Sequence, residues 1–153
     1  MKKSIVAALA LASAATFSGA SVAAPATAPN AQDKAAHTLR WKLNETASHN
    51  VGRNHFVGSD TIRSRRTGEI IGYDSTTGSF FPKTSMVRLQ VAASVKGGIL
   101  VGRLRADFST VADVVVFEGP ILKGTGKFKG VEGTITAKSS NGGNKTFVTI
   151  QYR

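Results

Sequence analysis

The sequence predicts an all-β domain, and among all-β architectures it favours an eight-stranded antiparallel β-barrel. From His37 onward, short stretches alternate apolar and polar residues with a period of two, which is typical of strands. Glycine-containing turn signals separate these stretches, and no window after residue 37 has an apolar stripe at helical spacing. A β-sandwich of the same size fits these observations too. The barrel is preferred because closure removes exposed strand edges.

The alternation predicts eight strands in order along the chain. They cover residues 39–43, 54–62, 69–74, 87–95, 100–108, 113–118, 131–138 and 145–152. The turn signals between them are Thr67-Gly68, Thr77-Gly78, Lys96-Gly97-Gly98, Gly119-Pro120 and Ser140-Asn141-Gly142-Gly143. An eight-stranded barrel has an interior just large enough for side chains or for one small ligand. Aromatic side chains at 41, 56, 108, 117 and 147 fill that interior if they point inward, and leave a pocket if they point outward.

The first 23 residues resemble a cleaved secretory signal peptide. Lys2 and Lys3 form a positive start, residues 5–15 form an apolar core, and Ser21-Val22-Ala23 matches a cleavage site after Ala23. The apolar core is shorter than the roughly 20 residues of a membrane-spanning helix, so no transmembrane anchor is expected. Residues 24–36 are predicted to be a flexible lead-in and residues 37–153 the barrel domain. The expected location is extracellular or periplasmic.

Composition excludes several kinds of site. The chain has no cysteine, which removes disulfides and thiolate metal ligands. Removing Lys2 and Lys3 from the formal net charge of +11 leaves +9, which predicts attraction to anionic cell-surface polymers or simply a solubilising exterior. The basic cluster Arg63, Arg65 and Arg66 has no interleaved aromatic residues for base stacking. It indicates a solvated turn, and no nucleic-acid partner is expected.

The motifs that usually identify cofactor or metal chemistry are missing. Gly124-Thr125-Gly126-Lys127 lacks the Ser or Thr that follows the lysine of a P-loop, and no βα unit follows it. It is interpreted as a tight turn. His37, His49 and His55 do not have zinc-ligand spacing, and no serine or cysteine nucleophile motif is present. The sequence therefore predicts no metal site and no organic cofactor.

Four polar residues on the predicted strands are candidates for a ligand site. Alternation places Arg103 and Arg105 on one face of their strand, which either lines the barrel or forms its outer polar face. Glu118 follows Val114 and Val116 on one side of its strand, so it is a candidate proton donor or acceptor, or else a solvated strand-end carboxylate. The phenol of Tyr73 either reaches a ligand or is the wet tip of a core residue.

Three stretches carry a resemblance to a known family. Phe117-Glu118-Gly119-Pro120 and the later Gly124-Thr125-Gly126-Lys127-Phe128 are similar to the strand end and glycine-rich turn of the allene oxide cyclase and dirigent superfamily. Leu43-Asn44-Glu45 is similar to the Ile-Asn-Glu of the cyclase branch. The likeness spans most of residues 39–153. Asn44 matches the asparagine that holds a water near the substrate oxygen in that branch.

The resemblance implies an eight-stranded antiparallel barrel with an apolar cavity, assembled as a homodimer or homotrimer. It implies that the protein binds a small apolar molecule. The protein is then expected either to act as a cofactor-free cyclase or isomerase, or to hold a flexible substrate in a reactive shape as dirigent proteins do. Templating needs a shaped pocket more than it needs nucleophiles. The competing expectation is a non-catalytic structural or surface-interaction protein with a filled barrel and a basic exterior. The candidate ligand-binding residues are Asn44, Tyr73, Arg103 and Arg105, and the candidate catalytic residue is Glu118.

Overall fold

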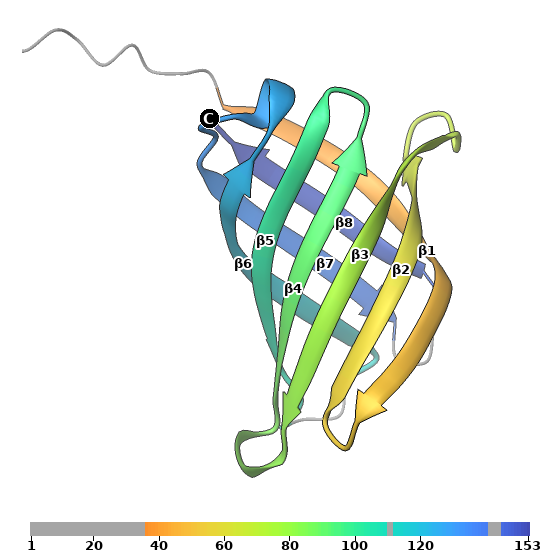
Figure 1. Ribbon diagram of the computed structural model, residues 1–153, viewed down its shortest axis with the longest axis vertical. Coiled ribbons are helices and arrows are strands. Elements are labelled where there is room, and N and C mark those ends of the chain that lie inside the picture. The colour runs from red at the N-terminus through yellow and green to blue at the C-terminus, as the bar shows by residue number, and fades with distance from the viewer. Residues whose placement is uncertain (1–35, 110–111, 141–144) are drawn as a thin grey trace, which may run out of the picture. The chain divides into compact units, whose positions relative to one another are not determined.

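The structure is a computed structural model that describes residues 36–109, 112–140 and 145–153. The described residues form one closed antiparallel barrel of eight strands in sequential order, with the last strand paired to the first (Figure 1). The prediction of an all-β barrel is confirmed, and the sandwich is excluded. The predicted signal peptide and all of the lead-in except Ala36 lie outside the described residues.

Most strands are longer than the alternating stretches that predict them. They are β1 His37–Gly52, β2 His55–Ser64, β3 Ile70–Phe81, β4 Met86–Val95, β5 Gly98–Asp107, β6 Val114–Gly124, β7 Gly133–Ser140 and β8 Lys145–Tyr152. The two short 3-10 helices are η1 Pro82–Thr84, between β3 and β4, and η2 Gly126–Phe128, between β6 and β7. Among the described residues there is no helix with the length and apolar character needed to cross a membrane.

Strand alternation separates an apolar interior from a polar exterior. On β5, Leu100, Leu104 and Ala106 are buried in the barrel, whereas Arg103 and Arg105 are exposed. Hydrogen-bond register carries the same division to the neighbouring strands: Leu104 is opposite Leu89 on β4, and both belong to the core. The hydrophobic core is therefore the inside of the barrel.

Two of the predicted turns are wrong. Thr77-Gly78 lies inside β3, opposite Gln90 and Leu89 of β4, and Gly119-Pro120 lies inside β6. These glycines serve close packing within the sheet. A Cβ atom on Gly78 would overlap the Phe56 ring, and one on Gly119 would overlap the carbonyl oxygen of Arg103.

The segment 124–128 closes one end of the barrel. Phe128 is fully buried and belongs to the core cluster that includes Leu100, Ile135 and Ile150. The peptide N–H of Lys127 donates to the carbonyl oxygen of Gly97 at 2.8 Å, which fastens η2 to the β4–β5 turn. Gly126 has a φ of 57°, and a Cβ there would overlap Gly97. The interpretation of this glycine-rich motif as a tight turn is confirmed.

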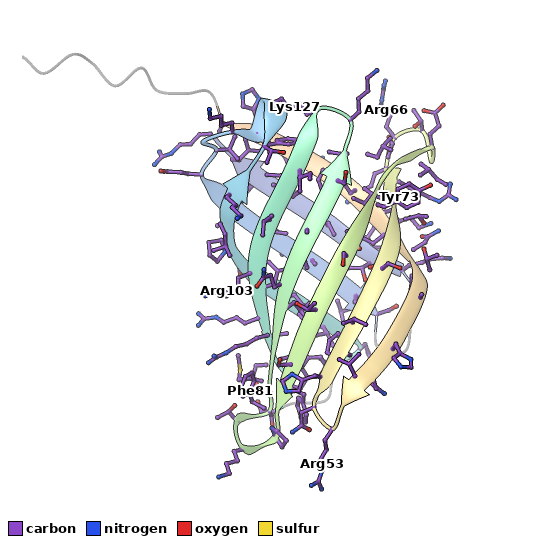
Figure 2. The ribbon with its side chains drawn as sticks, in the orientation of Figure 1. Arg53, Arg66, Tyr73, Phe81, Arg103 and Lys127 are labelled. Atoms are coloured by element: carbon purple, nitrogen blue, oxygen red, sulfur yellow. The ribbon has the colours of Figure 1, made fainter. Side chains whose placement is uncertain are left out.

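The last part of β1 extends beyond its pairing with β8. The pairs between these strands run from His37–Tyr152 to Asn44–Lys145, and in the described chain the rest of β1 pairs only with β2. A bulge interrupts the β1–β2 register between Glu45 and Ala47. This overhang lies toward the end of the barrel that carries Arg53, opposite the end that carries Lys127 (Figure 2).

Candidate functional site

The barrel encloses a cavity of about 200 Å³. All eight strands contribute to its wall. The wall is mostly apolar and aliphatic, with hydroxyl groups and three carboxyl groups set into it. The lining side chains are Trp41, Leu43, Glu45, Ala47, Ser48, Phe56, Ser59, Asp60, Asp74, Thr76, Leu89, Val91, Ala93, Leu100, Leu104, Phe117, Ile135, Ala137, Ser139, Thr146, Val148 and Ile150, together with Gly58.

The cavity is deep at one end and reaches solvent near the β1 overhang. Leu100 and Ile150, which pack with Phe128 in the closed end, are almost completely buried. Ala47 and Ser48, which follow the β1 bulge, also line the cavity but are exposed. A small molecule therefore has a route from solvent past the overhang to the apolar base of the barrel.

The aromatic side chains line the cavity without filling it. Trp41, Phe56 and Phe117 are part of its wall. Phe108 and Phe147 are exposed, so two of the five aromatic residues that bear on the filled-barrel expectation are not inside. The described barrel is therefore not packed solid, contrary to the expectation of a filled interior.

Three carboxyl groups occupy neighbouring positions on three adjacent strands. Register pairs Glu45 of β1 with Asp60 of β2, and Asp60 with Asp74 of β3. Directly opposed residues on one face of an antiparallel pair have Cβ atoms about 4.5–5.5 Å apart. The peptide N–H of Asp60 donates to Oδ1 of Asp74 at 3.1 Å. Burial increases along this row: Glu45 is exposed, Asp60 is half-buried, and Asp74 is buried with 7% of its surface accessible.

Burial and mutual repulsion change the acidity of the aspartate pair. Loss of solvation, followed by the negative charge of Asp60, raises the pKa of Asp74 to about 7. Loss of solvation also raises the pKa of Asp60, with a smaller contribution from the charge of Glu45. Near neutral pH the Asp74 carboxyl therefore exists in both protonation states, and it can donate or accept a proton beside an apolar cavity.

The carboxyl groups of this row are not arranged as a set of metal ligands among the described residues. Within residues 36–109, 112–140 and 145–153, no three or more His, Cys, Asp or Glu side chains are placed to hold a metal ion. The chemistry available at this wall is proton transfer and hydrogen bonding.

The structure places four of the sequence-predicted residues on the outer face of the barrel. Arg103, Arg105 and Glu118 are exposed, and Arg105 is opposite Glu118 in the β5–β6 register. Tyr73 is 61% accessible and alternates with the inward-facing Asp74. None of the four lines the cavity, because each is one residue out of phase with the inward positions of its strand. Their predicted roles stay predictions.

Asn44 also lies outside the cavity wall, between the lining residues Leu43 and Glu45. Its backbone carbonyl oxygen accepts a hydrogen bond from the Thr61 hydroxyl at 3.3 Å. Its side-chain Oδ1 is buried and has no hydrogen-bond partner among the described residues. Its predicted role toward a substrate oxygen stays a prediction as well.

Sequence reasoning did not single out Asp60 or Asp74. Both follow the alternation of their strands: Asp60 is in phase with Phe56 and Ile62, and Asp74 is in phase with Thr76. An acidic residue at a position in phase with apolar ones is a signal for a functional group inside a barrel. The two residues are 14 positions apart, however, and only strand pairing brings them together.

Comparison with known proteins finds similar structures but no similar sequences. No protein family model and no curated protein sequence matches the chain. Among solved structures, the chain is similar to pyocyanin demethylase, with a TM-score of 0.60, 17% identity, and coverage of 76% of this chain and 100% of that one. It is also similar to the Diels-Alderase AbmU from Streptomyces koyangensis, with a TM-score of 0.50, 10% identity, and coverage of 77% and 63% of the two chains.

These likenesses show the fold. The chain shares a β-barrel architecture with both proteins. The resemblance to the allene oxide cyclase and dirigent superfamily rests on the sequence motifs given above and stays a prediction.

Proposed function

We propose that this protein binds a small, mostly apolar organic molecule inside the barrel and catalyses its isomerisation or cyclisation without a metal or an organic cofactor. The observation that carries the proposal is the cavity itself, which combines an apolar wall with a buried carboxyl group, Asp74, that titrates near neutral pH. Pockets of this composition are the usual sites of small-molecule binding.

The size and lining of the cavity define the kind of molecule. Its volume of about 200 Å³ is below the roughly 300–1,000 Å³ of pockets for drug-sized ligands. Apolar groups of the ligand gain free energy by leaving water for a wall that includes Leu89, Val91 and Val148. The hydroxyl and carboxyl groups then fix its orientation.

The aspartate pair supplies the chemistry in this proposal. Because its pKa is raised to about 7, the Asp74 carboxyl accepts a proton from one atom of the substrate or donates one to it at neutral pH, and the less buried Asp60 carboxyl beside it takes the opposite role. Two carboxyl groups with different burial favour this division of roles. The shaped wall holds a flexible substrate in a reactive geometry, which lowers the entropic part of the barrier.

The structural neighbours support an enzymatic role. Both names denote enzymes that act on organic molecules, one a demethylase of pyocyanin and the other a Diels-Alderase. The proposal includes export of the barrel through the predicted signal peptide and assembly into a homodimer or homotrimer, as the family resemblance implies. In this proposal, attraction of the basic exterior to anionic surface polymers keeps the exported protein at the cell surface and has no part in catalysis.

Ligand binding is tested by native mass spectrometry on the protein purified from its own source. We expect a co-purifying small molecule that is lost from Ser139→Phe, because Ser139 lines the cavity and a phenyl ring there occupies its space. The matched control is Ser140→Phe, which places the same ring on the outer face of the same strand. A clean apo mass for the wild-type protein, or equal retention of the molecule by both variants, would contradict the proposal.

A further inference from the structure

The cavity wall is acidic in a protein that is strongly basic. The lining includes Glu45, Asp60 and Asp74 but no lysine, arginine or histidine. The whole chain has 20 Lys and Arg residues against 9 Asp and Glu residues. Three of the nine acidic residues therefore gather at one place, and the basic side chains are absent from the wall that these three share.

This row of like charges lowers the stability of the folded protein when no ligand is bound. Like charges placed directly opposite each other on adjacent strands destabilise a sheet, and here two such pairs follow one another from β1 to β3. The next position in the row is Ala93 on β4, which brings no compensating charge. The remaining lining residues of β5 to β8 are also uncharged. A positive charge inside the cavity would relieve the repulsion that the fold itself leaves unopposed.

We propose that the natural ligand is a small ring-containing organic molecule that carries a positive charge when bound, with the charged group beside the Asp60–Asp74 pair. Its rings contact the rest of the wall, where Trp41, Phe56 and Phe117 offer aromatic surface. Aromatic faces attract cations as well as apolar rings, so carboxyl groups and aromatic side chains select the same ligand. This inference rests on the proposed function, because it names the chemistry of a ligand for that same cavity.

The basic exterior does not reverse this selection. Interactions between exposed charges are screened within about 8 Å at physiological ionic strength. The aspartate pair acts on a bound ligand at contact distance and from a partly buried position, where screening is much weaker. A negatively charged ligand would instead meet all three carboxyl groups on entering the cavity.

The test compares two probes that differ in charge. N-methylquinolinium is a permanent cation, and 2-methylquinoline has the same rings and one methyl group but is uncharged at pH 8. Isothermal titration calorimetry of both probes at pH 8 should show at least tenfold tighter binding of the cation to the wild-type protein. The preference should fall several-fold in Asp60→Asn and in Asp74→Asn, and should persist in Glu69→Gln, which removes an exposed negative charge from the β2–β3 turn.

Proton release gives an independent readout. A cation beside the pair favours its ionised form, so binding near pH 7 should release protons from Asp74, with Asp60 and Glu45 as the other titratable groups that face it. Titrations in two buffers of different ionisation enthalpy measure this release, and Asp74→Asn should abolish most of it. If 2-methylquinoline binds as tightly as the cation, the charge assignment is overturned while small-molecule binding stands. If neither probe binds but an apolar molecule co-purifies, the charge assignment is likewise overturned and the proposed function is retained.

Discussion

At the scale of single residues, the distinctive group is the buried Asp74 carboxyl. A carboxyl group in the wall of an apolar cavity loses solvation, and its neighbour Asp60 adds like charge. Both effects disfavour the ionised form, so Asp74 makes the folded state less stable at neutral pH than an uncharged residue of the same shape would. Such a residue is expected where function rather than stability selects it.

We predict that Asp74→Asn stabilises the protein in a pH-dependent way. Because the folded-state pKa of Asp74 is raised to about 7 from 3.8, the folded protein binds the proton more tightly than the unfolded chain does. The wild-type protein should therefore lose stability relative to the variant as the pH rises from about 4 to about 7, by on the order of a few kcal/mol. Above that range the difference should stay constant.

Urea unfolding at several pH values measures this difference. Glu69→Gln is the control, since it removes one negative charge at an exposed site in the β2–β3 turn, outside the cavity wall. A stability gap between the wild-type protein and Asp74→Asn that does not change with pH would contradict the raised pKa of this group.

At the scale of elements, η2 and the residues around it determine how the barrel ends. Thr125 is fastened to β5 in both directions: its N–H donates to the carbonyl oxygen of Ile99 at 2.9 Å, and its hydroxyl accepts from the Ile99 N–H at 3.0 Å. This position brings the Phe128 ring into the core, where it meets Tyr152 edge-on with the ring centroids 6.1 Å apart. The glycine-rich segment 124–128 therefore places Phe128, the largest fully buried side chain of the described barrel, in the core.

We predict that Phe128→Ala lowers the free energy of unfolding by about 3–5 kcal/mol, the range for loss of a fully buried aromatic ring. Denaturant unfolding monitored by far-UV circular dichroism measures the loss. Phe81→Ala is the matched control, because Phe81 is 40% accessible and contacts Arg88 on the exterior. We expect a loss below about 1 kcal/mol for the control. Similar losses for both variants would show that η2 does not close the core.

Sequence alternation was sufficient to predict most of the elements. The stretch 145–152 coincides with β8, and 87–95 falls one residue short of β4, because apolar and polar residues alternate through most of both strands. The extent of β3 and β6 could not be predicted. Gly78 and Gly119 are indistinguishable from turn glycines in the sequence, and the groups that require them, the Phe56 ring and the Arg103 carbonyl, come from other strands.

The site could be predicted only as a cavity. The size of the barrel indicated an interior for one small ligand, and the structure has such a cavity. The side chains in its wall depend on which phase of each strand points inward, and single strands do not reveal this where both faces carry polar residues. This ambiguity applies to β2 and β3, whose Asp60 and Asp74 lie inside. On β5 the apolar face points inward, and Arg103 and Arg105 lie outside.

At the scale of the whole molecule, the cavity wall and the exterior of the barrel carry charges of opposite sign. Acidic groups line the cavity, and the exterior carries basic groups such as Arg65 and Arg66 in the β2–β3 turn. Arg65 lies over the exposed Phe147 ring, 4.9 Å from its centroid, so part of the basic surface is held in place by the barrel wall. The exterior and the interior are therefore suited to partners of opposite charge.

We predict salt-sensitive binding of the protein to anionic polymers. The protein should be retained on a polyanionic matrix at low ionic strength and released as salt is added, because exposed charges are screened. A double variant, Arg65→Glu with Arg66→Glu, should elute at clearly lower salt, whereas Asp74→Asn should elute close to the wild-type protein. Elution of all three at the same salt concentration would contradict a role for this turn in surface attraction.

Closure of one barrel end by Phe128 restricts how molecules are exchanged. With the base of the cavity sealed by the core and solvent access beside the β1 overhang, whatever enters must leave by the same route. In the proposed reaction, a product blocks the entry of the next substrate until it departs, so product inhibition should be competitive with substrate. The same restriction suits reactions of one molecule at a time, since a second reactant would have no separate path to the carboxyl groups.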